Sequence, residues 1–158
     1  MAQIEYLPHN VPSAPGAKVA IVFSKWYREY SLSMINKCQE VLRSAGFSKA
    51  ELHELPGCLE IPLSVRRLLK RDPSLEAVIV FGVILKGDTY HFDVVKDLCM
   101  SGLERVSFEL DTPIINEILP VDSINDVIIR AGDDNRNKGI EAGLAAAEII
   151  AWRRKYPL

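Results

Sequence analysis

The chain has 158 residues, of which 48% are apolar, and its formal net charge is −2 at pH 7. This is enough material for one domain with a proper core, and the charge offers no basic field for binding nucleic acid. No apolar run approaches the roughly 20 residues that cross a bilayer, and the first residues lack a secretory signal pattern. We therefore expect a soluble, cytoplasmic protein without nucleic-acid or membrane partners.

Strands and helices are predicted to alternate along the chain, from runs of apolar residues and from helical periodicity. A proline-rich arm, residues 1–16, comes first, and its apolar side chains Ile4, Tyr6 and Leu7 need a surface to lie on. The expected strands are residues 18–23, 50–55, 77–81 and 113–119. The expected helices are residues 31–45, 61–70, 89–102, 123–131 and 137–155. Residues 105–110 are expected to form either a continuation of the third helix or a short strand.

Such alternation predicts a parallel sheet covered on both faces. We expect residues 17–158 to form one α/β domain, a flavodoxin-like three-layer α/β/α sandwich with a four-stranded parallel sheet. Ligands in open parallel sheets bind at the carboxyl edge of the strands. The expected strands lead at that edge into four segments, residues 24–27, 56–60, 83–89 and 116–121.

Two residues at this edge have both a functional and an ordinary interpretation. Trp26 follows the first strand, where it is either a platform for a flat heterocycle or an ordinary core or interface tryptophan. Glu60 lies at the start of a helix, where its carboxylate either caps free backbone N–H groups or accepts hydrogen bonds from substrate hydroxyls.

The segment from Lys86 to His91 is the most informative one. A buried strand leads through two glycines into a helix, and the N–H groups and dipole at such a helix start attract anions. We expect His91 one turn inside this helix, where it can titrate near neutral pH. This pattern suggests a phosphate-bearing substrate handled by an acid–base histidine, although His91 can equally be structural and Asp88 only an N-cap.

A polar loop connects the last two helices. It is either a solvated connector capped at Gly132 or the carrier of a phosphate-binding arginine, Arg130, with Glu141 free to orient a histidine. Sequence distance does not say whether Glu141 reaches His91. The cysteines and histidines lack metal-ligand spacings, and no phosphate-binding glycine motif occurs, so we expect neither a metal nor a cofactor.

Three motifs carry a resemblance to a known family. They are Pro56-Gly-x-x-Glu60-Ile-Pro62, Gly82-x-x-x-Lys86-Gly-x-Thr89-x-His91-Phe, and Arg130-Ala-Gly-(x)4-Asn137-Lys138-Gly-x-Glu141-Ala. From Lys18 to Ile150 the chain resembles the lumazine synthases of riboflavin biosynthesis. The resemblance implies a transferase that joins 5-amino-6-(D-ribitylamino)uracil to 3,4-dihydroxy-2-butanone 4-phosphate, with release of phosphate and water. A non-catalytic flavin or lumazine binder on the same fold is the alternative.

The resemblance also implies roles for individual residues. His91 would transfer protons, Glu141 would pair with it, and Arg130 would bind phosphate. The expected substrate-binding residues are Trp26, Gly57, Cys58, Leu59, Glu60, Ile84, Leu85, Lys86, Asp88, Thr89, Asn116 and Lys138.

The family assembles as pentamers, some of which form 60-subunit capsids, and an adjacent subunit would supply Asn116, Arg130, Lys138 and Glu141. A riboflavin synthase would be a further partner. The chain departs from the family pattern at Tyr27, Asn116, Glu117 and Pro120, and Glu117 stands where glycine is frequent.

Overall fold

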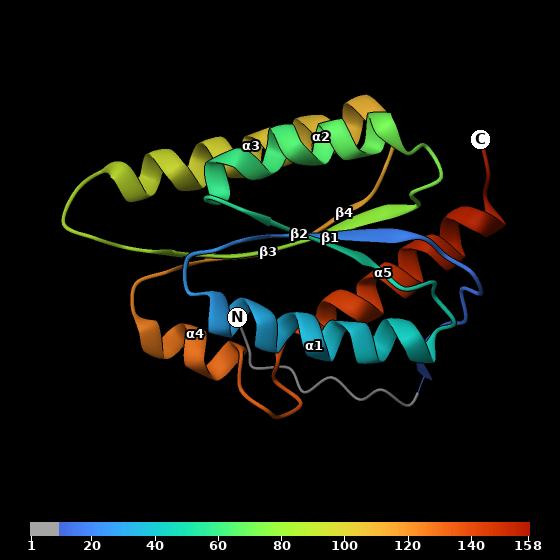
Figure 1. Cartoon of the computed structure of the whole chain (residues 1–158), viewed down its shortest axis with the longest axis horizontal. Helices are drawn as coiled ribbons and strands as arrows, with labels where there is room; N and C mark the ends of the chain where they lie inside the picture. The colour runs from blue at the N-terminus through green and yellow to red at the C-terminus, as the bar shows by residue number, and fades with distance from the viewer. Residues whose placement is uncertain (1–9) are drawn as a thin grey trace.

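A computed structural model describes residues 10–158 and shows a four-stranded parallel sheet between two layers of helices (Figure 1). The sheet order is β2-β1-β3-β4. The strands are β1 (Val19–Ser24), β2 (Glu51–Leu55), β3 (Ala77–Leu85) and β4 (Ile114–Val121). The helices are α1 (Arg28–Ser44), the short 3₁₀ helix η2 (Cys58–Glu60), α2 (Ile61–Arg71), α3 (His91–Leu110), α4 (Ile124–Arg130) and α5 (Lys138–Lys155).

Helices α2 and α3 cover one face of the sheet, and α1, α4 and α5 cover the other, so the predicted three-layer fold is confirmed (Figure 1). Alternate residues of each strand enter opposite layers. In β1, Ile21 packs in the core beneath α1 and α5, whereas Val22 packs in the core beneath α2 and α3. None of the helices within residues 10–158 has the length and apolarity needed to cross a membrane.

Three element boundaries differ from those expected by three residues or more. Strand β3 continues through Gly82 to Leu85, because its last residues pair with the second half of β4 as far as Val121. Helix α3 runs unbroken to Leu110, so residues 105–110 continue the helix. Helix α1 begins at Arg28, immediately after Tyr27, whose left-handed backbone (φ 55°, ψ 42°) turns the chain out of β1.

The start of the described chain packs against the end of α1. The N–H of Ala14 donates to the carbonyl of Ala45 at 2.8 Å, and that of Gly16 donates to the carbonyl of Gly46 at the same distance. Gly46 has the positive φ of 86° that a helix C-terminus commonly needs. The expected contacts of Ile4, Tyr6 and Leu7 concern residues outside the described part of the chain.

Helices α1 and α5 touch backbone to backbone at two glycines of α5. A Cβ added at Gly139 would lie 1.7 Å from the carbonyl oxygen of Met34, and one added at Gly143 would lie 2.7 Å from the Cβ of Val41. Asn137, which is fully buried, caps α5 by accepting a hydrogen bond from the N–H of Gly139 at 2.8 Å. This contact fixes the first turn of α5, with Lys138 and Glu141, relative to α1.

We expect Gly139→Ala to lower the free energy of unfolding by about 2 kcal/mol or more, because the added methyl group has no space without moving α5 away from α1. Gly132→Ala is the matched control, since its Cβ would meet only an ordinary contact of 3.4 Å. Urea unfolding of both variants checks this, and equal midpoints for the two would show that α5 does not pack this closely.

Candidate active site

A pocket of about 310 Å³ lies at the carboxyl edge of the sheet, beside the start of α3. We call it the carboxyl-edge pocket. Eight residues expected at the site line it, namely Trp26, Gly57, Cys58, Leu59, Glu60, Ile84, Leu85 and His91. Three other residues complete its wall, namely Tyr27, Val83 and Val95. The ends of β1, β2 and β3 and the start of α3 therefore converge on one space.

The floor of this pocket depends on Gly82. Its missing side chain makes room for two polar groups, because a Cβ there would lie 2.8 Å from the Sγ of Cys58 and 3.1 Å from the Oγ of Ser24. The thiol of Cys58 donates to the hydroxyl of Ser24 at 3.6 Å. This contact ties η2 down onto β1 and β3. Burial raises the pKa of the Cys58 thiol, which disfavours the thiolate that a nucleophilic cysteine needs.

Glu60 and Trp26 are available to a ligand. Glu60 occupies the N-cap position of α2, but its side chain makes no capping hydrogen bond, so capping does not explain it. A Cβ at Gly57 would lie 3.0 Å from the Oε2 of Glu60 and 3.8 Å from the Nε1 of Trp26, so both side chains border the same turn. Trp26 is 62% exposed, which excludes a core role within this chain.

His91 is the first residue of α3. The expectation that it lies one turn inside the helix is therefore wrong. Its N–H donates to the Oγ1 of Thr89 at 3.4 Å. Within residues 10–158, the N–H groups of residues 87–90 donate no hydrogen bond, and no side chain caps α3 at its N-cap position, Tyr90. Asp88 is therefore not the N-cap. These N–H groups at the positive end of the helix dipole suit an anion beside His91.

Lys86 lies in the same loop as Asp88 and Thr89, outside the carboxyl-edge pocket. Its N–H donates to the carbonyl of Val121 at 2.9 Å, and its ammonium lies 3.5 Å from the Oδ1 of Asp122. These contacts anchor the loop to the end of β4 and pair the ammonium of Lys86 with Asp122.

Four further expected residues lie apart from both the pocket and this loop. Arg130 ends α4, where its Nη1 donates to the carbonyl of Asp126 at 2.8 Å. Lys138 and Glu141 form an ion pair at the start of α5. Helices α4 and α5 lie on the face of the sheet opposite to α3, which carries His91 (Figure 1), and none of Arg130, Lys138 and Glu141 lines the pocket.

Asn116 is the fourth residue that lies apart. It is on β4, in a separate hollow beside α3. Its Nδ2 donates to the Sδ of Met100 at 3.0 Å, and its Oδ1 accepts from the N–H of Ile118 at 3.0 Å. The side chain is therefore held against its own subunit at the free edge of the sheet.

The residues missed in the sequence had usable signals. Val83 follows from extending β3 to its true end, and Val95 lies one helical turn after His91. Tyr27 adjoins Trp26 in the turn after β1 and was considered only as a departure from the family pattern. Within residues 10–158, no group of three or more His, Cys, Asp or Glu side chains could hold a metal ion.

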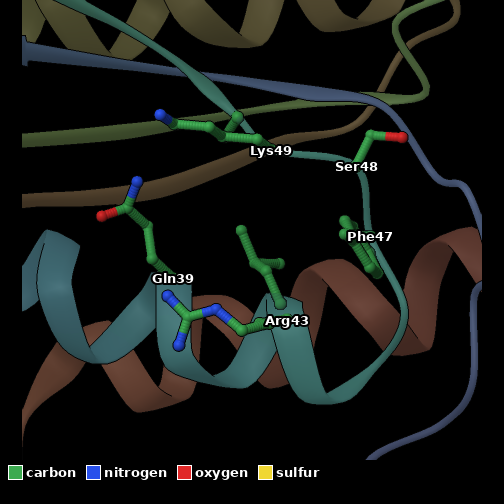
Figure 2. Close-up of a pocket in the computed structure, with 7 residues that line it drawn as sticks. Gln39, Arg43, Phe47, Ser48 and Lys49 are labelled. Atoms are coloured by element: carbon green, nitrogen blue, oxygen red, sulfur yellow. The ribbon is translucent and has the colours of Figure 1, made fainter.

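A larger hollow, of about 460 Å³, lies at the opposite edge of the sheet (Figure 2). Gln39 and Arg43 reach it from α1, and Phe47, Ser48 and Lys49 line it just before β2 begins. It contains none of the expected site residues. Because ligands of open parallel sheets bind at the carboxyl edge, we assign the site to the smaller carboxyl-edge pocket.

The sequence matches known proteins over nearly its whole length. The family described as 6,7-dimethyl-8-ribityllumazine synthase matches residues 16–154. A protein of that name from Xylella fastidiosa (strain 9a5c) is 34% identical over 144 residues, which cover 90% of this chain and 93% of the relative. One from Stenotrophomonas maltophilia (strain K279a) is 32% identical over 143 residues, 89% of this chain and 92% of the relative.

Substituting Gly82 tests the pocket floor. We expect Gly82→Ala to lower the free energy of unfolding by about 1–3 kcal/mol, because the methyl group displaces Cys58 and with it the turn that carries Glu60. Gly87→Ala is the control, since a Cβ there meets nothing within 4 Å. Thermal unfolding of both variants measures the effect, and a Gly82→Ala protein as stable as the control would contradict the packing described.

Proposed function

Because this chain belongs to the 6,7-dimethyl-8-ribityllumazine synthase family, we propose that it is a transferase of riboflavin biosynthesis. It condenses 5-amino-6-(D-ribitylamino)uracil with 3,4-dihydroxy-2-butanone 4-phosphate to 6,7-dimethyl-8-ribityllumazine and releases phosphate and water. One observation carries this proposal in the structure: Trp26, Glu60 and His91 line one pocket at the carboxyl edge of the sheet. An aromatic platform, a free carboxylate and a proton-transfer group suit a ribityl-bearing pyrimidine.

The carboxyl-edge pocket accounts for the pyrimidine substrate. The exposed indole of Trp26 stacks on the ring, and Ile84 and Leu85 supply apolar contacts beside it. The ribityl hydroxyls donate to the carboxylate of Glu60, which capping leaves free, and meet the backbone of residues 57–59. This orientation turns the substrate amine toward the start of α3.

The phosphate of the second substrate binds at the start of α3. The unbonded N–H groups of residues 87–90 and the hydroxyl of Thr89 face it, and Lys86 lies in the same loop. Arg130 of an adjacent subunit adds a guanidinium, which binds phosphate oxygens in a bidentate manner. Fixed donors of this kind stabilise the charge that develops as phosphate leaves.

The chemistry is a sequence of proton transfers. The amine attacks the ketone and loses water to give an imine, and elimination of phosphate then gives an enol. The enol tautomerises to a ketone, and the second nitrogen attacks this ketone and closes the ring as water leaves. His91 moves the protons between these atoms. The substrates carry their own nucleophile and leaving group, so positioning supplies much of the acceleration.

The proposal includes a homo-oligomer. Helices α4 and α5, which carry Arg130, Lys138 and Glu141, cover the face of the sheet opposite to α3, and none of these residues lines the pocket of their own chain. In the proposed oligomer a neighbouring subunit supplies them. An exposed apolar stripe along α3 offers an interface, and it consists of Tyr90, Val94, Leu98 and Phe108. We propose a cytoplasmic pentamer that assembles further into a 60-subunit capsid and passes its product to a riboflavin synthase.

Arg130→Ala is the decisive variant for the reaction. We expect it to lower kcat/KM for lumazine formation by about 100-fold or more, because the departing phosphate loses its guanidinium. Arg67→Ala, at an exposed arginine of α2, is the matched control. Product is followed by absorbance with the uncatalysed rate subtracted.

Equal rates for the two variants would contradict the assigned phosphate site. If the unmodified protein forms no product, while riboflavin quenches its fluorescence and fails to quench that of Trp26→Phe, the chain is a binding protein and not the enzyme.

A further inference from the structure

Glu117 is a buried carboxyl group in the middle of β4. Its neighbours on the same side of the strand, Ile115, Leu119 and Val121, pack in the core beneath α1 and α5. Glu117 lies two residues from Ile115 and two from Leu119, so its side chain points to the same face of the sheet and enters that layer. Only 8% of its surface is exposed. A glutamate rarely occupies such a position without a partner or a role.

The first turn of α5 supplies the charges near Glu117. Lys138 and Glu141 interact with it electrostatically, and they form an ion pair with each other. Two of the elements that pack on β4 or α5 bring no charged side chain close to Glu117. Helix α1 brings the buried thiol of Cys38, and β3 brings the apolar Phe81 at the paired position.

Two charged side chains on the neighbouring helices are paired with other groups. On α4, Arg130 and Asp126 lie 3.5 Å apart, nitrogen to oxygen. On α1, Lys37 lies 2.6 Å from the Oδ1 of Asp133. The close contact of Gly139 with Met34 keeps the first turn of α5 from moving away from β4. Lys138 and Glu141 are therefore the ionic environment that Glu117 meets.

The charges do not balance if Glu117 ionises. Lys138 already neutralises Glu141, so a second carboxylate in this buried space would lack a full counter-charge. Burial, and then the negative charge of Glu141, raise the pKa of Glu117 to about 8, while Lys138 acts in the opposite direction. At neutral pH the Glu117 carboxyl therefore carries its proton.

We propose that Glu117 is a protonated positioning residue that keeps Lys138 paired with Glu141 and oriented toward the substrate held by the adjacent subunit. The inference rests on the proposed function, in which Lys138 lies near the ribityl chain. With its proton, Glu117 leaves the Lys138–Glu141 pair intact. When the proton is lost, a second carboxylate competes for the ammonium of Lys138 and draws it inward, away from the ribityl hydroxyls.

The test compares the pH dependence of KM in three proteins: the unmodified enzyme, Glu117→Gln and Glu148→Gln. Gln copies the shape of the protonated acid but cannot ionise, and Glu148 is an exposed glutamate of the same helix, α5. KM for the ribitylaminouracil of the unmodified enzyme should rise about tenfold between pH 7 and pH 9, since the binding-competent fraction falls to about a tenth. Its kcat should change far less.

Glu148→Gln should reproduce the rise in KM, and Glu117→Gln should abolish it. Identical KM profiles for all three proteins, or a pH effect confined to kcat, would overturn the inference.

A second measurement separates this inference from the proposed function. Carboxyl ¹³C NMR, with the Glu117 signal assigned by its loss in Glu117→Gln, should show a titration midpoint near pH 8. A midpoint near that of an exposed glutamate would overturn the inference even if the enzyme is active. If no lumazine forms at any pH, the proposed function fails, and the positioning role fails with it. In that case, an NMR midpoint near pH 8 would support only one part of the inference, namely that Glu117 is protonated at neutral pH.

Discussion

The space left by the missing side chain of Gly82 is the constraint on which the candidate site depends. Cys58 and Ser24 fill this space, and their contact holds the turn after β2 against the central strand. This turn carries Glu60 and borders Trp26, so the pocket wall is set by backbone packing and not by the ligand. Strand β3 can then continue to Leu85 and place its last residues in the same wall. A pocket formed in this way is preorganised for an orienting role, which suits a reaction whose substrates carry their own reactive groups.

A second constraint acts on the opposite face of the sheet. Gly139 and Gly143 bring α5 into direct contact with α1 and so fix Lys138 and Glu141 over Glu117. In the proposed oligomer, the two halves of the site are positioned separately within each chain and meet across a subunit interface. Within one chain, Arg130 is paired with Asp126, and Lys138 is paired with Glu141. In that oligomer, each subunit has its own pocket and contributes Arg130, Lys138 and Glu141 to the pocket of a neighbour.

The fold and half of the site could be predicted from the sequence because both depend on local signals. Apolar runs and helical periodicity identified the four strands and the layers, and the Pro56-Gly57 turn placed Glu60. The end of β3 could not be predicted, since a glycine in a strand resembles a break unless its contact with Cys58 is known. The separation of Glu141 from His91 depends on which face of the sheet each helix covers. The burial of Glu117 was not predicted, because residues 114–121 do not alternate between apolar and polar side chains and the charged residues near Glu117 lie on α5, distant in the sequence.

The most direct test of the account is complementation between inactive subunits. His91→Ala and Arg130→Ala proteins are mixed, dissociated and reassembled, and lumazine formation is compared with that of each variant treated alone. In a ring of head-to-tail interfaces, about a quarter of the interfaces in an equal mixture would join an intact His91 to an intact Arg130. The account predicts that about a quarter of the unmodified activity returns. Hybrids no more active than the two parents would show that the site is not shared between subunits and would contradict the account.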